Sequence, residues 1–129
     1  MNLNQVTVPV SNVEVSIDFY EKLGLKIIVK ALPNYARFEC PEGDSTFSIH
    51  EASTSQKEDG VAVYFEVKNL DSYVQQLIDK GIEFDELPND KSWLWRESRL
   101  KDPDYNQIIL YFAGNNRKYP PWRSDHDPS

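Results

Sequence analysis

The chain has 129 residues, a formal net charge of -7, and hydrophobic and aromatic shares of 40% and 12%. This length suits one domain with a sizeable core. An acidic surface repels phosphate backbones, so the charge argues against a nucleic-acid partner. No segment approaches the ~20 consecutive apolar residues that span a bilayer, so we expect no membrane partner.

The redox compartment is indicated by cysteine usage and by the N-terminus. The single cysteine, Cys40, cannot form an internal disulfide. The first residues are polar, with Asn2, Asn4 and Gln5, and lack the basic and apolar regions of a signal peptide. Together these features predict a reducing, cytoplasmic location.

The first half of the chain predicts a strand, a helix and three more strands. Residues 3–9 form the first strand. Asn12 is a suitable helix N-cap, apolar residues then recur at helical spacing, and Gly24 ends the helix. The three following strands are expected at 25–30, 34–40 and 45–51, with "PEGD" (41–44) as the turn of a hairpin.

The second half predicts the same order of elements. A polar loop at 53–60 separates the halves. Asn69 is the predicted N-cap of a second helix that ends at Gly81. The strands are expected at 61–67, 82–86, 93–100 and 106–113.

This repetition keeps its register along the chain. A shift of 57 residues places Asn12 on Asn69 and Gly24 on Gly81, and apolar helix positions also coincide. Such agreement favours an internal duplication. We therefore predict one α+β domain made of two βαβββ repeats, about 3–52 and 60–113, which form a curved mixed sheet around a shared cavity. An extended tail is expected at 114–129.

Four motifs carry a resemblance to a known family: "SIDFYEKLGL" (16–25), "VYFEVKNLD" (63–71), "KGIEF" (80–84) and "LKDPDYNQIILY" (100–111). With this layout, they resemble the vicinal oxygen chelate superfamily, which includes glyoxalases, bleomycin-resistance proteins and extradiol dioxygenases. The ending "NNRKYPPWR" (115–123) resembles a poorly characterised glyoxalase-like subset. The resemblance implies the glyoxalase/bleomycin-resistance-like fold and a homodimer. One fold hosts many chemistries, so it does not fix the function.

In the metal-dependent members, the ligands come from the first and last strand of each repeat. The resemblance maps these positions to Gln5, Ser48, Ala62 and Ile109. Only Gln5 is a plausible ligand, and a divalent transition ion needs three or four N, O or S donors. The apolar Ile109 stands where enzymes of the family have Glu. We therefore expect no bound metal and no cofactor.

Other side chains could supply a metal site if the strand register differs. The two histidines are His126, in the polar tail, and His50. Glu66 and Glu97 could add carboxylates. A two-residue slip of the strand at 45–51 would replace Ser48 by His50.

Period-two geometry extends the predicted cavity wall. If the four mapped positions face the cavity, so do Thr7, His50, Tyr64 and Tyr111. These hydroxyls, phenols and imidazole suit a medium-sized organic ligand. The alternative is that the tyrosines are core aromatics and that His50 is hydrogen-bonded to a neighbour. The hairpin turn places Tyr35 opposite His50.

The stretch "WLWRESR" (93–99) is unusually rich in aromatic and charged residues. Strand alternation puts Trp93, Trp95, Glu97 and Arg99 on one face, which the resemblance turns toward the cavity. Two indoles one pleat apart would stack on a planar ligand, and Glu97 and Arg99 would bind its polar end or pair with each other. The alternatives are that the indoles fill the cavity or lie at a dimer contact, and a bulge would invert the face.

These observations favour a small-molecule binding protein that works without a catalytic metal and contains no assigned catalytic residue. The predicted ligand-binding residues are Gln5, Thr7, Ser48, His50, Tyr64, Trp93, Trp95, Glu97, Arg99, Ile109 and Tyr111. The alternative is a metal-dependent lyase, isomerase or dioxygenase with a noncanonical set drawn from Gln5, His50 and Glu97. A third hypothesis makes Glu97 a proton-transfer base without metal. In a fourth, the cavity is filled and the dimer contact or tail is the functional surface.

Overall fold

The computed structural model describes residues 1–52 and 61–124. It divides into two compact units, Met1–Ala62 with Lys101–Gln107, and Val63–Leu100 with Ile108–Ser129. The predicted loop at 53–60 and the end of the predicted tail, which includes His126, lie outside the described residues.

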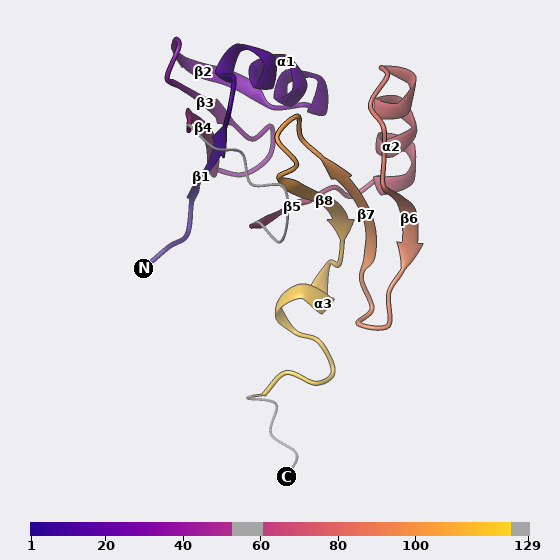
Figure 1. The fold of residues 1–129 in the computed structure, drawn as a ribbon. Helices are drawn as coiled ribbons and strands as arrows, with labels where there is room; N and C mark the ends of the chain where they lie inside the picture. The colour runs from indigo at the N-terminus through magenta and orange to yellow at the C-terminus, as the bar shows by residue number, and fades with distance from the viewer. Residues whose placement is uncertain (53–60, 125–129) are drawn as a thin grey trace. The chain divides into compact units, whose positions relative to one another are not determined.

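The first unit carries a four-stranded sheet in the order β1-β4-β3-β2. Strand β1 runs parallel to β4, whereas β3 is antiparallel to both β2 and β4. Helix α1 packs on this sheet against β2, β3 and β4 (Figure 1). The elements are β1 (Gln5–Val10), α1 (Val13–Leu23), β2 (Lys26–Ala31), β3 (Tyr35–Glu39) and β4 (Thr46–Glu51).

Helix α1 has the predicted caps and supplies the core of the first unit. The side chain of Asn12 accepts a hydrogen bond of 3.0 Å from the Val15 N–H, and Gly24 adopts a φ of 120°. Tyr20, which is fully buried, packs its ring against those of Phe38 and Phe47 at centroid distances of 5.9 and 4.8 Å. The core therefore lies between α1 and the sheet face that carries these two phenylalanines.

The second unit repeats the order of elements. Its sheet has the order β5-β8-β7-β6, which corresponds strand for strand to that of the first sheet. This confirms the predicted α+β fold class with two βαβββ halves. The elements are β5 (Ala62–Glu66), α2 (Leu70–Asp79), β6 (Glu86–Asp90), β7 (Arg96–Lys101) and β8 (Gln107–Phe112), followed by the short helix α3 (Asn115–Lys118).

The strand predicted at 82–86 is wrong, because β6 spans Glu86–Asp90. Pro88 lies inside β6 and argues against a strand there. The structure accommodates this proline because β6 is at the edge of its sheet, and its pairing with β7 shifts register between Glu86 and Asn89. An edge position and an irregular register both tolerate a residue without an N–H.

The strand predicted at 93–100 begins too early. Strand β7 starts at Arg96, and residues 92–94 form a turn in which Leu94 has a φ of 67°. The Lys91 N–H donates to the Trp95 carbonyl at 2.8 Å and closes this turn. Trp93 and Trp95 are therefore not successive residues on one face of a strand.

The described part of the tail also differs from the extended segment predicted there. Asn115–Lys118 form α3, and the Arg123 N–H donates to the Pro120 carbonyl at 3.1 Å in a turn.

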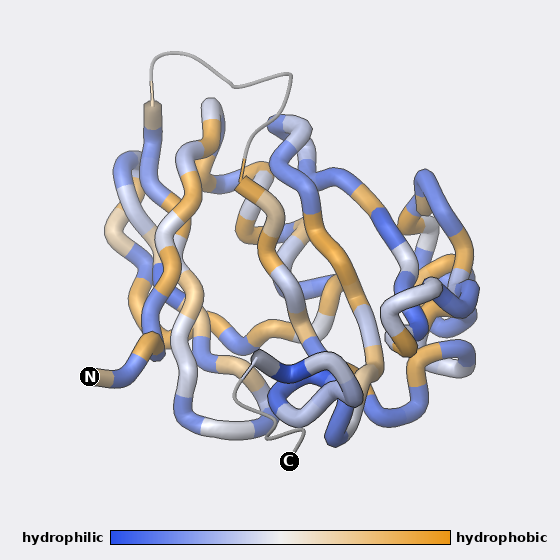
Figure 2. Tube along the Cα trace, turned by 90° about the horizontal axis from the view of Figure 1, so that it is seen from below, coloured by the Kyte–Doolittle hydropathy of each residue, from blue (hydrophilic) through white to orange (hydrophobic). Residues whose placement is uncertain are grey.

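Figure 2 shows hydrophilic and hydrophobic residues interleaved along the strands. Within residues 1–52 and 61–124, no helix is long and apolar enough to cross a membrane.

Candidate ligand-binding site

The sheet face of the first unit that is opposite α1 carries a chain of polar side chains. The Gln5 amide nitrogen donates to Ser48 Oγ at 2.5 Å, and Ser48 Oγ lies 2.7 Å from the Tyr35 hydroxyl. Arg37 Nε donates to the same hydroxyl at 2.8 Å. Ser48 is fully buried, so these bonds satisfy a hydroxyl that water cannot reach.

These contacts influence the ionisation of Tyr35. Partial burial acts to raise the pKa of Tyr35, but the hydrogen bonds with Ser48 and Arg37 outweigh it and hold the pKa below its ordinary value. Tyr35 and Arg37 were not among the predicted site residues. The sequence contained the signal, because the predicted hairpin placed Tyr35 opposite His50, and period-two alternation adds Arg37.

The structure confirms this hairpin register, with Tyr35 paired to His50. His50 is exposed, and its Nδ1 lies 3.2 Å from the Glu51 carbonyl oxygen. Thr7 is paired with Ser48, and its hydroxyl accepts a bond of 3.2 Å from Gln5. The structure therefore brings Gln5, Thr7 and Ser48 together, whereas His50 lies beyond them near the end of β4.

The second sheet carries an aromatic cluster formed by Tyr64, Trp95 and Tyr111. The rings of Trp95 and Tyr111 are stacked at 4.8 Å, with an interplanar angle of 24°. The Tyr64 ring meets both edge-on, 6.0 Å from Trp95 and 5.5 Å from Tyr111. Tyr64 is 45% exposed whereas Tyr111 is buried, so the cluster is anchored on β8 and accessible at Tyr64.

Polar contacts fix this aromatic cluster at its border. The Trp95 indole N–H donates to the Asn116 carbonyl in α3 at 3.1 Å. One carboxylate oxygen of Glu66 accepts from both the Ala113 and Gly114 N–H groups at 2.9 Å. Burial, followed by the charge of Glu66, raises the pKa of Tyr111. Glu66, considered from sequence as a metal ligand, instead holds the backbone after β8.

Residues on β7 separate into two faces. Arg96 binds Asp71 of α2 with two hydrogen bonds of 2.8 Å, so its side chain lies on the face that α2 covers. Alternation then places Glu97 and Arg99 on the opposite face. The sequence also predicts that Glu97 and Arg99 share the face opposite Arg96.

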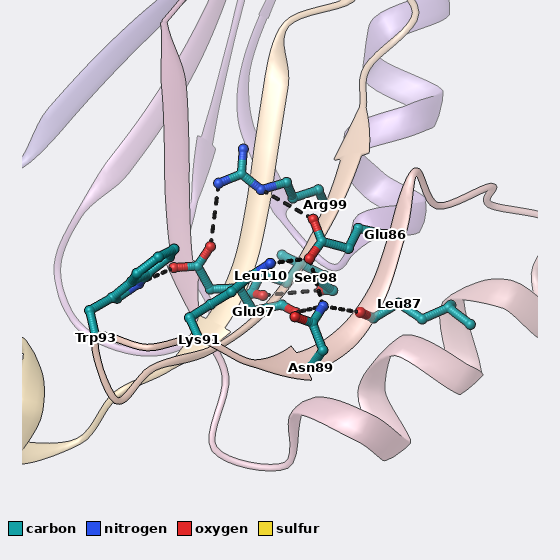
Figure 3. A network of polar contacts seen from close by, with 9 residues as sticks. All are labelled: Glu86, Leu87, Asn89, Lys91, Trp93, Glu97, Ser98, Arg99 and Leu110. Carbon is teal, nitrogen blue, oxygen red and sulfur yellow. Dashed lines mark hydrogen bonds and ion pairs between the residues drawn. The ribbon is translucent and has the colours of Figure 1, made fainter.

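Glu97 and Arg99 belong to the polar network shown in Figure 3. The Trp93 indole N–H donates to Glu97 Oε2 at 2.7 Å, and Arg99 Nη2 lies 3.5 Å from Glu97 Oε1. Arg99 Nε also lies 3.5 Å from Glu86 Oε2. Hydrogen bonds from Lys91 and then Asn89 lower the pKa of Glu86. Trp93 and Trp95 therefore have different partners and form no continuous platform.

The residues at the family's metal positions do not fit a metal ion. Gln5 and Ser48 already share a hydrogen bond, and Ala62 and Ile109 have no donor atoms in their side chains. Ile109 is 1% exposed within the buried run Ile108–Tyr111 of β8. In the part of the chain that the structure describes, no three His, Cys, Asp or Glu side chains cluster as a metal would require.

Comparisons with known proteins agree with this fold. The family model of the Glyoxalase/Bleomycin resistance protein/Dioxygenase superfamily matches residues 2–110. A glyoxalase/bleomycin resistance protein/dioxygenase from Nocardioides matches with a TM-score of 0.74 and 20% identity, covering 88% of this chain and 83% of that one. A bleomycin resistance determinant encoded on the transposon Tn5 gives a TM-score of 0.73 at 17% identity, covering 87% and 98%.

A curated relative also matches in sequence. The uncharacterised protein YraH of Bacillus subtilis (strain 168) is 26% identical over 127 residues, which cover 86% of this chain and 98% of that protein. The two solved structures share less than a quarter of their residues with this chain, so they show its fold alone. Together with the matched family model, they confirm the resemblance drawn from the four sequence motifs.

Proposed function

Because the chain belongs to the Glyoxalase/Bleomycin resistance protein/Dioxygenase superfamily, we propose that it binds a small organic molecule and needs no catalytic metal to do so. The aromatic cluster of Tyr64, Trp95 and Tyr111 is the observation that carries this proposal. It offers a planar or partly aromatic ligand a rigid, partly exposed aromatic surface. Offset-stacked and edge-to-face ring contacts each contribute about 0.5–1.5 kcal/mol beyond burial.

The rigidity of the cluster supports binding. Trp95 is held by its stack on Tyr111 and by its hydrogen bond to Asn116, so its ring loses little freedom when a ligand arrives. The stronger exposure of Tyr64 leaves ring surface available for contact. Aromatic side chains are common in the lining of small-molecule sites, where a few polar groups fix the orientation of the ligand.

The proposal includes no catalytic metal, because the residues at the family's metal positions offer too few donor atoms. A divalent ion would have to be held by Gln5, whose Oε1 already accepts a hydrogen bond from Thr46, and by the bonded Ser48 hydroxyl. The side chains of Ala62 and Ile109 offer no lone pair. The metal-dependent alternative needs His50 and Glu97 instead. Glu97 is already bonded to Trp93, which disfavours that alternative.

Several finer predictions accompany this proposal. Besides the cluster, the predicted binding residues include Gln5, Thr7, Ser48, His50 and Ile109, with Trp93, Glu97 and Arg99. A homodimer and a cytoplasmic location also remain predictions.

A screen of planar organic compounds, followed by calorimetric titration of the hits, tests the proposal. Tyr64→Ala should weaken binding about three- to tenfold, which corresponds to the loss of one aromatic contact. Tyr105→Ala is the matched control, because Tyr105 is similarly exposed at 52% but belongs to the other unit. Equal affinity in Tyr64→Ala and the control would contradict a site on this cluster.

A further inference from the structure

Glu97 is a buried acid whose two oxygens are unequally satisfied. Its side chain is 1% exposed, and Oε2 accepts a bond of 2.7 Å from Trp93. Its Oε1 lies 3.5 Å from Arg99 Nη2, whereas charge-assisted hydrogen bonds measure about 2.7–2.9 Å. A buried carboxyl group is costly unless its acceptors are used, so Oε1 is suited to another donor.

Arg99 is held along one edge of its guanidinium group. Nε faces Glu86 and Nη2 faces Glu97, each at 3.5 Å. Figure 3 shows the remaining terminal nitrogen pointing away from both carboxylates. The side chain is 37% exposed, so this outer edge is open to an acceptor. Two carboxylates thus orient the guanidinium without using all five of its donors.

The charges around this pair select a neutral partner. Glu86 and Glu97 are balanced by Lys91 and Arg99, so the formal charges of the network cancel. A ligand ammonium beside Glu97 is attracted by that carboxylate and repelled by Arg99, and a ligand carboxylate beside Arg99 meets the opposite pair of forces. An ion therefore gains little from this network and loses its hydration, whereas a neutral group with one donor and one acceptor can use both partners.

We infer that Glu97 and Arg99 recognise a neutral amide-type group of the ligand. Its N–H donates to Glu97 Oε1, and its carbonyl oxygen accepts from Arg99 Nη2, which borders the open edge of the guanidinium group. An amide carries this donor and acceptor on one carbon, which matches an acceptor and a donor that lie 3.5 Å apart. This inference rests on the proposed function and adds the polar group of the ligand to the planar part that contacts the aromatic cluster.

Trp93 is the side chain that a ligand must displace. Glu97 is almost fully buried, and Trp93, which contacts it, is 41% exposed in the turn before β7. In the ligand-free protein its indole N–H satisfies Glu97 Oε2 and holds the ring beside the buried carboxylate, so a ligand N–H reaches Oε1 only when this ring moves. Trp93 therefore hinders access of the ligand, although its bond to Glu97 stabilises the fold.

Three naphthalene probes that differ in one substituent test this inference: 2-naphthamide, 2-naphthoate and 2-naphthylmethylamine. The chain has three tryptophans, so its indole N–H signals in a ¹H–¹⁵N spectrum can be assigned with single Trp→Phe variants. All three probes should shift the Trp95 signal. The carboxamide should bind about tenfold more tightly than the other two, in line with one additional hydrogen bond, and should move the Trp93 signal most.

Two variants separate recognition from structural support. Arg99→Lys keeps the charge but loses the two-donor edge, so it should abolish the preference for the carboxamide. Arg117→Lys, in the same unit but beside Glu66, is the matched control and should retain it. Trp93→Phe should lower the melting temperature yet bind the carboxamide more tightly, because the ring at position 93 is no longer held beside Glu97 by an N–H. A purely structural Trp93 would give no gain in affinity.

The outcomes distinguish the two proposals. Equal binding of the three probes, or tighter binding of the acid or the amine, overturns this inference and leaves the proposed function intact. If no probe shifts the Trp95 signal, both fail. If Trp93→Phe does not fold, the order of the three probe affinities on the wild-type protein and on Arg99→Lys still tests the inference.

Discussion

The hydroxyl of Tyr20 donates a hydrogen bond of 2.6 Å to Oδ2 of Asp102, a residue 82 positions later in the chain. The same carboxylate accepts from the Asp104 and Asn106 N–H groups and from the Asn106 amide. Asp102 therefore connects α1 to the turn before β8, and the Asn106 amide extends the link to the Pro9 carbonyl at 2.9 Å. The motifs "SIDFYEKLGL" and "LKDPDYNQIILY" meet at this carboxylate.

Tyr20→Phe should lower the free energy of unfolding by about 1.5–3 kcal/mol, because a buried hydrogen bond to a charged group is lost. Urea denaturation measures this change. Tyr105→Phe removes a hydroxyl from an exposed tyrosine in the same unit and should change stability by less than about 0.5 kcal/mol. Similar losses in the two variants would refute a special role for the Tyr20–Asp102 bond.

Stability should also depend on pH through Tyr20. Burial, and then the charge and hydrogen bond of Asp102, raises the pKa of Tyr20 far above its ordinary value. An unfolded tyrosine ionises near pH 10, so the contribution of Tyr20 is complete below about pH 10 and is lost as the pH rises above it. Above that pH, the difference in unfolding free energy between wild type and Tyr20→Phe should shrink by up to about 1.4 kcal/mol per pH unit. A constant difference from pH 8 to 11 would contradict this.

Glu66→Ala should destabilise the second unit by about 1–2 kcal/mol, because the buried Ala113 loses the acceptor for its N–H. Glu66→Gln retains an acceptor oxygen and should recover at least half of the loss. Amide hydrogen exchange provides the site-specific measurement, with protection lost at Ala113 and Gly114 in the alanine variant. Unchanged exchange at both amides would show that Glu66 does not hold this turn.

Leu94→Asn should stabilise the protein by about 0.5–1 kcal/mol. Leu94 has a φ of 67°, a left-handed conformation that costs most residues about 1–2 kcal/mol and that asparagine tolerates. Its side chain is 50% exposed, so little burial is lost. Ser92→Asn, in the same turn, is the control and should give no gain. Thermal unfolding compares the two, and an equal effect would rule out relief of strain at residue 94.

Nickel, zinc, cobalt, manganese and ferrous iron, added singly to chelator-treated protein, should leave the melting temperature unchanged. The reason is the donor set at the family's metal positions, where Ala62 and Ile109 cannot coordinate. A specific metal at ~100 times its dissociation constant would add about 2.7 kcal/mol. A saturable shift with one metal that vanishes in His50→Ala would restore the metal-dependent alternative.

Local sequence signals determined the order and type of most elements. Asn12 and Gly24 bound the first helix because capping and positive φ depend on a few neighbouring residues. The hairpin turn at 41–44 set the register that pairs Tyr35 with His50. Strand alternation then determined which side chains of β3 and β4 share a face of the sheet. The strand predicted at 106–113 is confirmed as β8, Gln107–Phe112.

Only the tertiary structure decided which side chains meet. Pro88 is acceptable in β6 because that strand lies at an edge, and Leu94 interrupts the run of alternation that would have aligned the two indoles. The burial of Glu97, its bond to Trp93 and the capture of two backbone N–H groups by Glu66 likewise depend on how elements pack. Spacing and capping act over a few residues and can be read from the sequence, whereas the partners of Tyr20, Glu66 and Trp95 lie 21 to 82 positions away and are fixed only when the sheets and helices assemble.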